Sequence, residues 1–76
     1  MSSDIETLFE KANDSFYNND YDTALKLYLE IVEKDKKNYL SFQKIAQIEL
    51  SRGNLEKSIE NYEKCLFACP GADFGV

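Results

Sequence analysis

The chain has 76 residues and no histidine or tryptophan, and its 14 acidic and nine basic residues give a net charge of −5. A chain of this length forms at most one small domain, which excludes a barrel or a doubly wound sheet. Its 43% apolar content excludes a disordered acidic tail, and its acidity makes nucleic acid and anionic membranes poor partners, because binding to them depends on patches of lysine and arginine.

The negative charge is concentrated at the start of the chain. Residues 1–22 carry six acids and one base, whereas the rest of the chain carries eight of each. One interpretation is that the first helix prefers a basic segment of a partner. The simpler interpretation is that acids such as Asp4, Asp20 and Asp22 stand near helix starts, where the helix dipole favours them.

Targeting signals and cysteine chemistry narrow the cellular setting. The first residues, Met1–Asp4, have neither the basic start nor the apolar stretch of a signal peptide, and no apolar run approaches the roughly 20 residues of a membrane span. We therefore expect a cytoplasmic or nuclear protein with reduced thiols. Cys65 and Cys69 alone cannot close a zinc site without histidine, so no metal or other cofactor is expected.

Turn signals divide the chain into four stretches of similar length. They lie at 18–20, 35–38, Gly53 and 69–71. The stretches between them show apolar side chains at spacings of three and four, which is typical of amphipathic helices. The expected helices are Ile5–Asn18, Tyr21–Lys34, Tyr39–Arg52 and Leu55–Ala68. No stretch shows the strict alternation of a half-buried strand, so the sequence predicts an all-α fold. Two-residue turns further predict antiparallel hairpins.

The turns and the apolar positions repeat along the chain with one common period. Shifting the sequence by 34 superposes Asn19-Asp20 on Gly53-Asn54, and Lys36 on Pro70. The same shift brings small and apolar residues into register: Leu8 on Phe42, Ala12 on Ala46, Phe16 on Leu50, Leu25 on Ile59, Tyr28 on Tyr62, Ile31 on Cys65 and Val32 on Leu66. Only two of the superposed pairs are identical, so the evidence lies in the agreement of turns with apolar positions.

A helix–turn–helix unit with this period resembles the tetratricopeptide repeat, a unit of about 34 residues whose pattern is Trp-x2-Leu-Gly-x2-Tyr, Ala-x3-Phe and Pro. The second copy reads Phe42-x2-Ile45-Ala46-x2-Glu49, Ser58-x3-Tyr62 and Pro70, and the first reads Leu8-x2-Lys11-Ala12-x2-Ser15 and Ala24-x3-Tyr28. The copies depart from the pattern at Lys11, Ser15, Glu49 and Ser58, and Lys36 stands in place of the proline. The resemblance implies a helical-repeat solenoid, an α-α superhelix in which a single domain, residues 1–76, holds repeats at about 5–38 and 39–72.

The same resemblance implies a function in protein interaction. In this family the first helix of each repeat lines a concave groove, which binds a peptide or helix of a partner protein. The groove positions in this sequence are Glu6, Phe9, Asn13 and Tyr17, followed by Gln43, Lys44, Gln47 and Ser51. A simpler interpretation is that Phe9 packs between helices and that the amides are ordinary surface.

An alternative within the family is a co-chaperone that binds the C-terminal tail of a heat-shock chaperone. That branch holds the carboxylate with lysine and asparagine side chains. Asn13 matches this set, but Phe9 and Lys44 replace a lysine and an asparagine, and the fifth helix that supplies further positive charge is absent from the sequence. Without those cations, capture of an anion is unfavourable.

Catalysis is not expected. There is no histidine to act as a general base, and no serine or cysteine has an evident activating partner. Asp73-Phe74-Gly75 matches a magnesium-binding triplet of protein kinases, but every other kinase motif is missing. The chain is therefore interpreted as a binding or structural protein.

The fourth predicted helix raises a separate possibility. It would expose a face containing Ile59, Tyr62 and Leu66, and a stack of repeats usually needs three units and a polar cap. Two interpretations remain open: either the chain is the N-terminal part of a longer protein, or it is complete and self-associates through this helix. The second would make it a structural or oligomerisation element.

Overall fold

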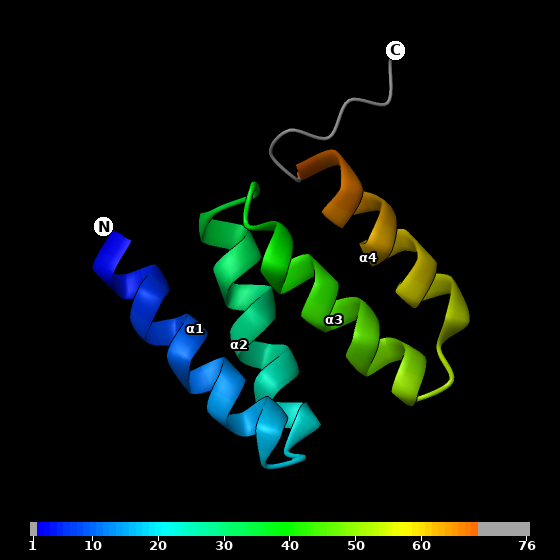
Figure 1. Ribbon diagram of the computed structural model, residues 1–76, viewed down its shortest axis with the longest axis horizontal. Helices are drawn as coiled ribbons and strands as arrows, with labels where there is room; N and C mark the ends of the chain where they lie inside the picture. Colours follow the sequence, from blue (N-terminus) through cyan, green and yellow to red (C-terminus); the bar gives the residue numbers. More distant parts are fainter. Residues whose placement is uncertain (1, 69–76) are drawn as a thin grey trace.

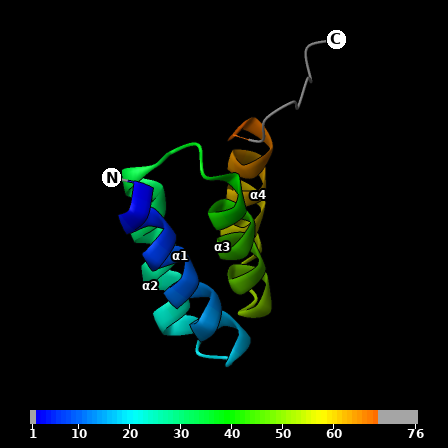
Figure 2. The same cartoon turned by 60° about the vertical axis from the view of Figure 1, so that its left-hand side comes forward.

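The computed structural model describes residues 2–68, which form four α-helices: α1 (Ser2–Tyr17), α2 (Tyr21–Lys34), α3 (Tyr39–Ser51) and α4 (Leu55–Ala68). The helices lie side by side in chain order and run in alternating directions (Figure 1). Figure 2 shows the same arrangement as two hairpins, α1–α2 and α3–α4, that meet where α2 packs against α3. The prediction of an all-α fold is confirmed for these residues.

The helix bounds agree closely with the predicted ones. The bounds of α2 and α4 are as predicted, and α3 ends one residue early, at Ser51. The largest difference is at α1, which begins at Ser2 rather than Ile5. Apolar spacing marks a helix only where apolar residues recur, so it does not detect a first turn made of polar residues such as Ser2, Ser3 and Asp4. The predicted break at Cys69–Gly71 and the triplet Asp73-Phe74-Gly75 lie outside the described residues.

The two hairpin turns have the same geometry. Asn19 and Gly53 both have positive φ values, 65° and 83°, in the left-handed region that asparagine and glycine tolerate best. The amide of the next residue then bonds back across the turn, from Asp20 N to Ser15 O at 2.8 Å and from Asn54 N to Glu49 O at 2.9 Å. Each turn thus ends its helix with an equivalent backbone bond and reverses the chain.

Small residues lie at the positions where the helices of each hairpin approach closely. Ala12 and Ala24 are completely buried in the first hairpin, and their counterparts Ala46 and Ser58 are 0% and 2% exposed in the second. A longer side chain at such a position would force the helices apart. The two hairpins are therefore built on equivalent contacts as well as equivalent turns.

The hydrophobic core is centred on α2. Its fully buried members come from three helices: Ala12, Ala24, Tyr28, Ile31, Ile45 and Ile48. Half-buried apolar side chains of α1 and α2, among them Leu8, Phe16 and Leu25, pack around them. Helix α4 contributes only Ser58 to the buried residues of the described chain and no member of this cluster, so it is the helix least held by the core.

The loop between the hairpins is held by side-chain caps. The carboxylate of Asp35 accepts a hydrogen bond from Lys37 N at 3.1 Å, and Asn38, the N-cap of α3, accepts one from Ser41 N at 3.1 Å. Such a cap satisfies a backbone donor that would otherwise have no partner within the helix. The loop thus sets the point at which α3 begins to pack against α2.

We expect Asn38→Ala to lower the free energy of unfolding by about 1 kcal/mol, because it removes the oxygen that caps α3. Asn38→Gly should cost only a few tenths of a kcal/mol, since glycine is itself tolerated at this position. Urea unfolding followed by circular dichroism measures both variants. An unchanged free energy of unfolding for Asn38→Ala would show that the cap does not stabilise α3.

Ser41 should respond in the opposite direction. It is completely buried, and its Oγ has no hydrogen-bond partner among the described residues. Ser41→Ala removes an unsatisfied hydroxyl and improves helix propensity, so we expect it to raise the free energy of unfolding by about 1 kcal/mol. The same urea titration measures this change, and a loss of stability would contradict it.

Candidate functional site

The described residues hold no group of three or more histidine, cysteine, aspartate or glutamate side chains that could bind a metal ion. Of the helices within residues 2–68, none combines the length and the apolar character needed to cross a membrane. Candidate sites are therefore sought on the surfaces of the helices. Two such surfaces stand out, one shared by α1 and α3 and one on the outer side of α4.

Two of the predicted groove residues are engaged inside the first hairpin. The Tyr28 hydroxyl donates a hydrogen bond to the side-chain oxygen of Asn13, and the Phe9 ring meets the Tyr28 ring edge-on at 5.9 Å between centroids. Both Phe9 and Asn13 are half-buried. Their contacts hold α1 against α2, so the interpretation of Phe9 as an interhelical packing residue is supported. Part of the Phe9 side chain and part of the Asn13 side chain nevertheless remain on the surface.

Tyr17 and Lys44 are the predicted groove residues that the structure brings together. The Lys44 ammonium lies 5.2 Å from the Tyr17 ring centroid and 4.6 Å from that of Phe16, and it donates a hydrogen bond to the Tyr17 hydroxyl at 3.5 Å. The Phe16 and Tyr17 rings meet edge-on at 5.4 Å. Cation–π and ring contacts of this kind hold the Tyr17 ring in place although the residue is 70% exposed.

The other predicted groove residues are distributed along α1 and α3. Gln43 and Gln47 are half-buried on α3, Ser51 is exposed at the end of that helix, and Glu6 is exposed near the start of α1. Spacing by four places Gln43, Gln47 and Ser51 along one side of α3. This side offers two amides and a hydroxyl to any chain lying along it.

The structure also shows interactions that were not predicted. The Arg52 guanidinium at the end of α3 pairs with the Asp22 carboxylate in the first turn of α2, which joins the two hairpins. Phe16 links α1 to α3 through Lys44, and Asn54 Nδ2 donates to the buried Glu49 carboxylate at 2.9 Å. For the Arg52–Asp22 ion pair, the only indication in the sequence was that opposite charges stand at the ends of neighbouring predicted helices. The two members of the ion pair are far apart in the sequence, beyond any helical period.

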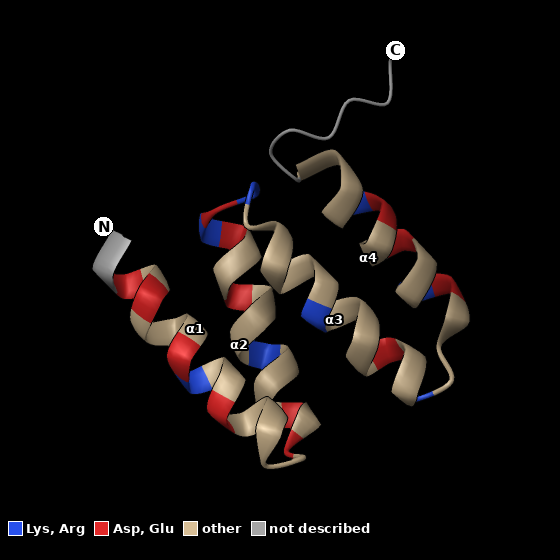
Figure 3. Ribbon diagram, viewed as in Figure 1, with Lys and Arg blue, Asp and Glu red and all other residues tan. Residues whose placement is uncertain are grey.

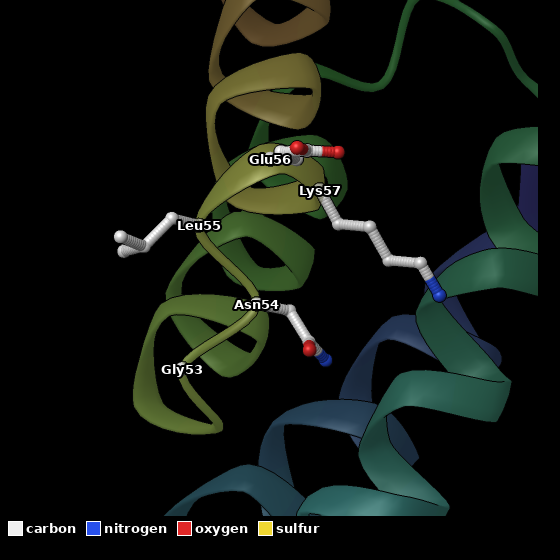
Figure 4. A pocket seen from close by; sticks show the side chains of 5 residues that line it. All are labelled: Gly53, Asn54, Leu55, Glu56 and Lys57. Atoms are coloured by element: carbon white, nitrogen blue, oxygen red, sulfur yellow. The ribbon is translucent and has the colours of Figure 1, made fainter.

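The outer side of α4 carries a row of exposed apolar side chains. Ile59, Tyr62 and Leu66 are 59%, 36% and 50% exposed, and Leu55 extends the row toward the start of the helix. The predicted exposure of Ile59, Tyr62 and Leu66 is thus found in the structure. A shallow depression of about 410 Å³ lies at the start of α4, lined by residues 53–57. There Leu55 points away from the other helices, whereas Lys57 points toward them (Figure 4).

Comparisons with protein-family models, with curated proteins and with solved structures found no match to this chain.

Burial of Tyr28 makes the stability of the fold sensitive to alkaline pH. Burial raises the pKa of the Tyr28 phenol from 10.0 to about 12, and the neighbouring Tyr17 phenol adds to the shift. Between these values the unfolded chain releases the Tyr28 proton and the folded chain keeps it. The unfolded state therefore binds fewer protons, and the free energy of unfolding should fall by up to about 1.4 kcal/mol per pH unit.

Tyr28→Phe is the matched control, because it keeps the ring and lacks the ionising group. Its stability should fall less steeply between pH 10 and 12 than that of the unaltered chain. Thermal unfolding at half-unit pH intervals measures both slopes. Equal slopes would show that Tyr28 does not cause the alkaline loss.

Proposed function

We propose that the chain is a protein-interaction module built from two tetratricopeptide-type repeats, which binds a peptide or helix of a partner protein across the surface shared by α1 and α3. The module works by shape and a few side-chain contacts and carries out no chemistry.

The equivalence of the two hairpins supports a repeat architecture. The positive-φ residues Asn19 and Gly53, the backbone bonds that follow them, and the buried small residues at the helix crossings all recur from the first hairpin to the second. Helix–turn–helix units of about 34 residues that pack on one another are typical of tetratricopeptide repeats. The agreement of turn and packing supports the family more strongly than the residue pattern alone.

The proposed function rests chiefly on the environment of Tyr17. Its ring is 70% exposed, yet Phe16 and Lys44 hold it from two sides. Tyrosine is enriched among the residues that dominate binding energy at interfaces, and an ordered ring loses little entropy when a ligand covers it. We therefore assign Tyr17 as the anchor of the binding surface, taking an apolar or aromatic side chain of the partner.

The polar residues at the predicted groove positions suit the backbone of such a partner. Gln43, Gln47 and Ser51 supply hydrogen-bond donors and acceptors on α3, and Lys44 and Glu6 supply one charge of each sign. Side-chain amides along a groove can bond to the peptide groups of an extended chain. We infer a ligand with an apolar anchor and little net charge.

A chaperone tail is a less suitable ligand than such a peptide. The side-chain oxygen of Asn13, the residue that matches the co-chaperone set, already accepts the hydroxyl of Tyr28. Lys44 is the one cation at the predicted groove positions, and it lies over two aromatic rings. A terminal carboxylate would find few positive partners here.

The test is to select binding peptides from a displayed random library against the intact chain and to measure the affinity of the best peptide by calorimetry. Tyr17→Ala should weaken it by about tenfold or more, as expected for loss of an aromatic anchor. Gln47→Ala should weaken it several-fold. Both residues are at the surface, so circular dichroism should show unchanged helicity.

Tyr62→Ala serves as the matched control, because Tyr62 is a partly exposed tyrosine on α4. It should leave the affinity of the selected peptide within about twofold. A peptide that loses affinity with Tyr62→Ala and keeps it with Tyr17→Ala would contradict the proposed surface and assign binding to α4.

A further inference from the structure

The face that the first hairpin presents to α3 is repeated on the second hairpin, where no described helix covers it. Five positions define the first face, and each has an apolar counterpart one repeat later: Phe16 and Leu50, Tyr21 and Leu55, Leu25 and Ile59, Tyr28 and Tyr62, Val32 and Leu66. We call the second set, together with Glu56, the end face. The two sets have the same chemistry but different surroundings.

Burial differs sharply between the two sets. Every member of the first set is buried or half-buried, and Tyr28 has no exposed surface. Every member of the second is exposed, from 36% for Tyr62 to 59% for Leu55 and Ile59. A contiguous apolar row of this kind marks an interaction site on a small domain. Helix α3 packs against the first set, so its side chains indicate which kind of helix the end face can bind.

Helix α3 covers the first face with a mixture of apolar and basic contacts. Ile45 and Ile48 enter the core beside α2, and the Lys44 ammonium lies over the Phe16 ring. At the end of the helix, Arg52 pairs with Asp22 of α2. The docked helix is therefore apolar at spacings of three and four and basic along one edge.

The end face carries the matching acidic group. Glu56 is the counterpart of Asp22, is exposed in the first turn of α4, and has no ion-pair partner among the described residues. Glu60 and Glu63 continue the acidic edge on the same side of the apolar row. Figure 3 shows acidic positions recurring along α4. The charge of this edge favours a basic occupant.

We propose that the end face binds an amphipathic helix of a partner protein, with apolar residues at i, i+3 or i+4 and i+7, and with an arginine or lysine at the end that meets Glu56. The partner helix lies across α3 and α4 as α3 lies across α1 and α2. This site is separate from the α1–α3 surface, so the two proposals stand or fall independently.

A second copy of the chain does not provide this helix. The positions of α1 equivalent to Ser41, Ile45 and Ile48 of α3 are Thr7, Lys11 and Asp14, so the side of α1 that would dock on the end face is polar. The apolar side of α1 is already packed in the core of its own chain. Antiparallel pairing of two α4 helices would bring the same acidic edge of each helix together, which is unfavourable. The complementary partner is a helix of opposite charge.

The experiment uses a helix of known docking geometry as its probe. A capped synthetic peptide with the sequence of residues 38–54 contains all of α3 with Lys44 and Arg52. It is added to the intact chain labelled with ¹⁵N, and amide shifts are followed through the titration. We expect shifts concentrated at residues 50–66, with saturation in the range of tens to hundreds of micromolar.

Charge reversal tests the proposed ion pair. Glu56→Lys should weaken binding of the peptide about threefold or more, and a peptide carrying R52E should restore it. Glu10→Lys, the same charge change at an exposed position on α1, is the matched control and should have less than half that effect. Equal effects of the two reversals, or no rescue by the altered peptide, would overturn the assignment of Glu56.

Two aspartate substitutions at exposed apolar positions test the contribution of the apolar row on α4. Ile59→Asp should weaken the peptide at least tenfold, whereas Leu40→Asp should not, since Leu40 is similarly apolar and 41% exposed but lies on another side of α3. Shifts centred on Tyr28 and Ala24 would mean that the peptide replaces the chain's own α3, and this would overturn the proposal. So would self-association through α4, seen by sedimentation at two concentrations, in place of peptide binding.

Discussion

The burial of Tyr28 is the contact on which the rest of this fold depends. Its ring lies at the centre of the core on α2, where it meets Phe9 and Phe16 of α1, and its hydroxyl bonds to Asn13. A buried phenol needs such a partner, because an unsatisfied hydroxyl in the core would cost about 1–3 kcal/mol. One residue therefore joins α1 to α2 by both packing and hydrogen bonding, and α3 then closes the core from the other side.

Tyr62, the counterpart of Tyr28, shows what the same side chain does without that enclosure. It stands at the equivalent place in the second hairpin and is 36% exposed, because no described helix lies beyond α4 as α3 lies beyond α2. The difference arises from position in the row of helices and not from the residue. It also explains why α4 contributes only a small residue, Ser58, to the buried set.

Much of this arrangement could be predicted from the sequence, because the determining signals are local. The turn residues Asn19 and Gly53, and the apolar spacing between them, are read within a short window of sequence, and they led to helix bounds close to those observed. The exposure of Tyr62 could also be predicted, because the sequence shows only four helical stretches and none of them follows the one that contains Tyr62. Packing of Phe9 between helices was one of two interpretations of the sequence, and the structure supports it. The hydrogen bond of Asn13 was not predicted, because it depends on which side of α1 turns toward Tyr28, and this is set by packing across the hairpin. The Arg52–Asp22 ion pair could not be predicted either, since it joins two helices through residues distant in the sequence.

Helix α3 belongs to both candidate surfaces, and this links them physically. Its Gln43, Gln47 and Ser51 lie on the side proposed to bind a peptide beside Tyr17, whereas Leu50 belongs to the end face. A helix that docks on the end face would bury Leu50 and the row on α4, and so would add to the second hairpin the enclosure that the first already has. Because a ligand that binds only the folded chain stabilises it by mass action, this gain would fall chiefly on α4, whose one buried residue is Ser58. An occupied end face would therefore stabilise the second hairpin, to which α3 belongs, and would leave Gln43, Gln47 and Ser51 accessible on the other side of α3.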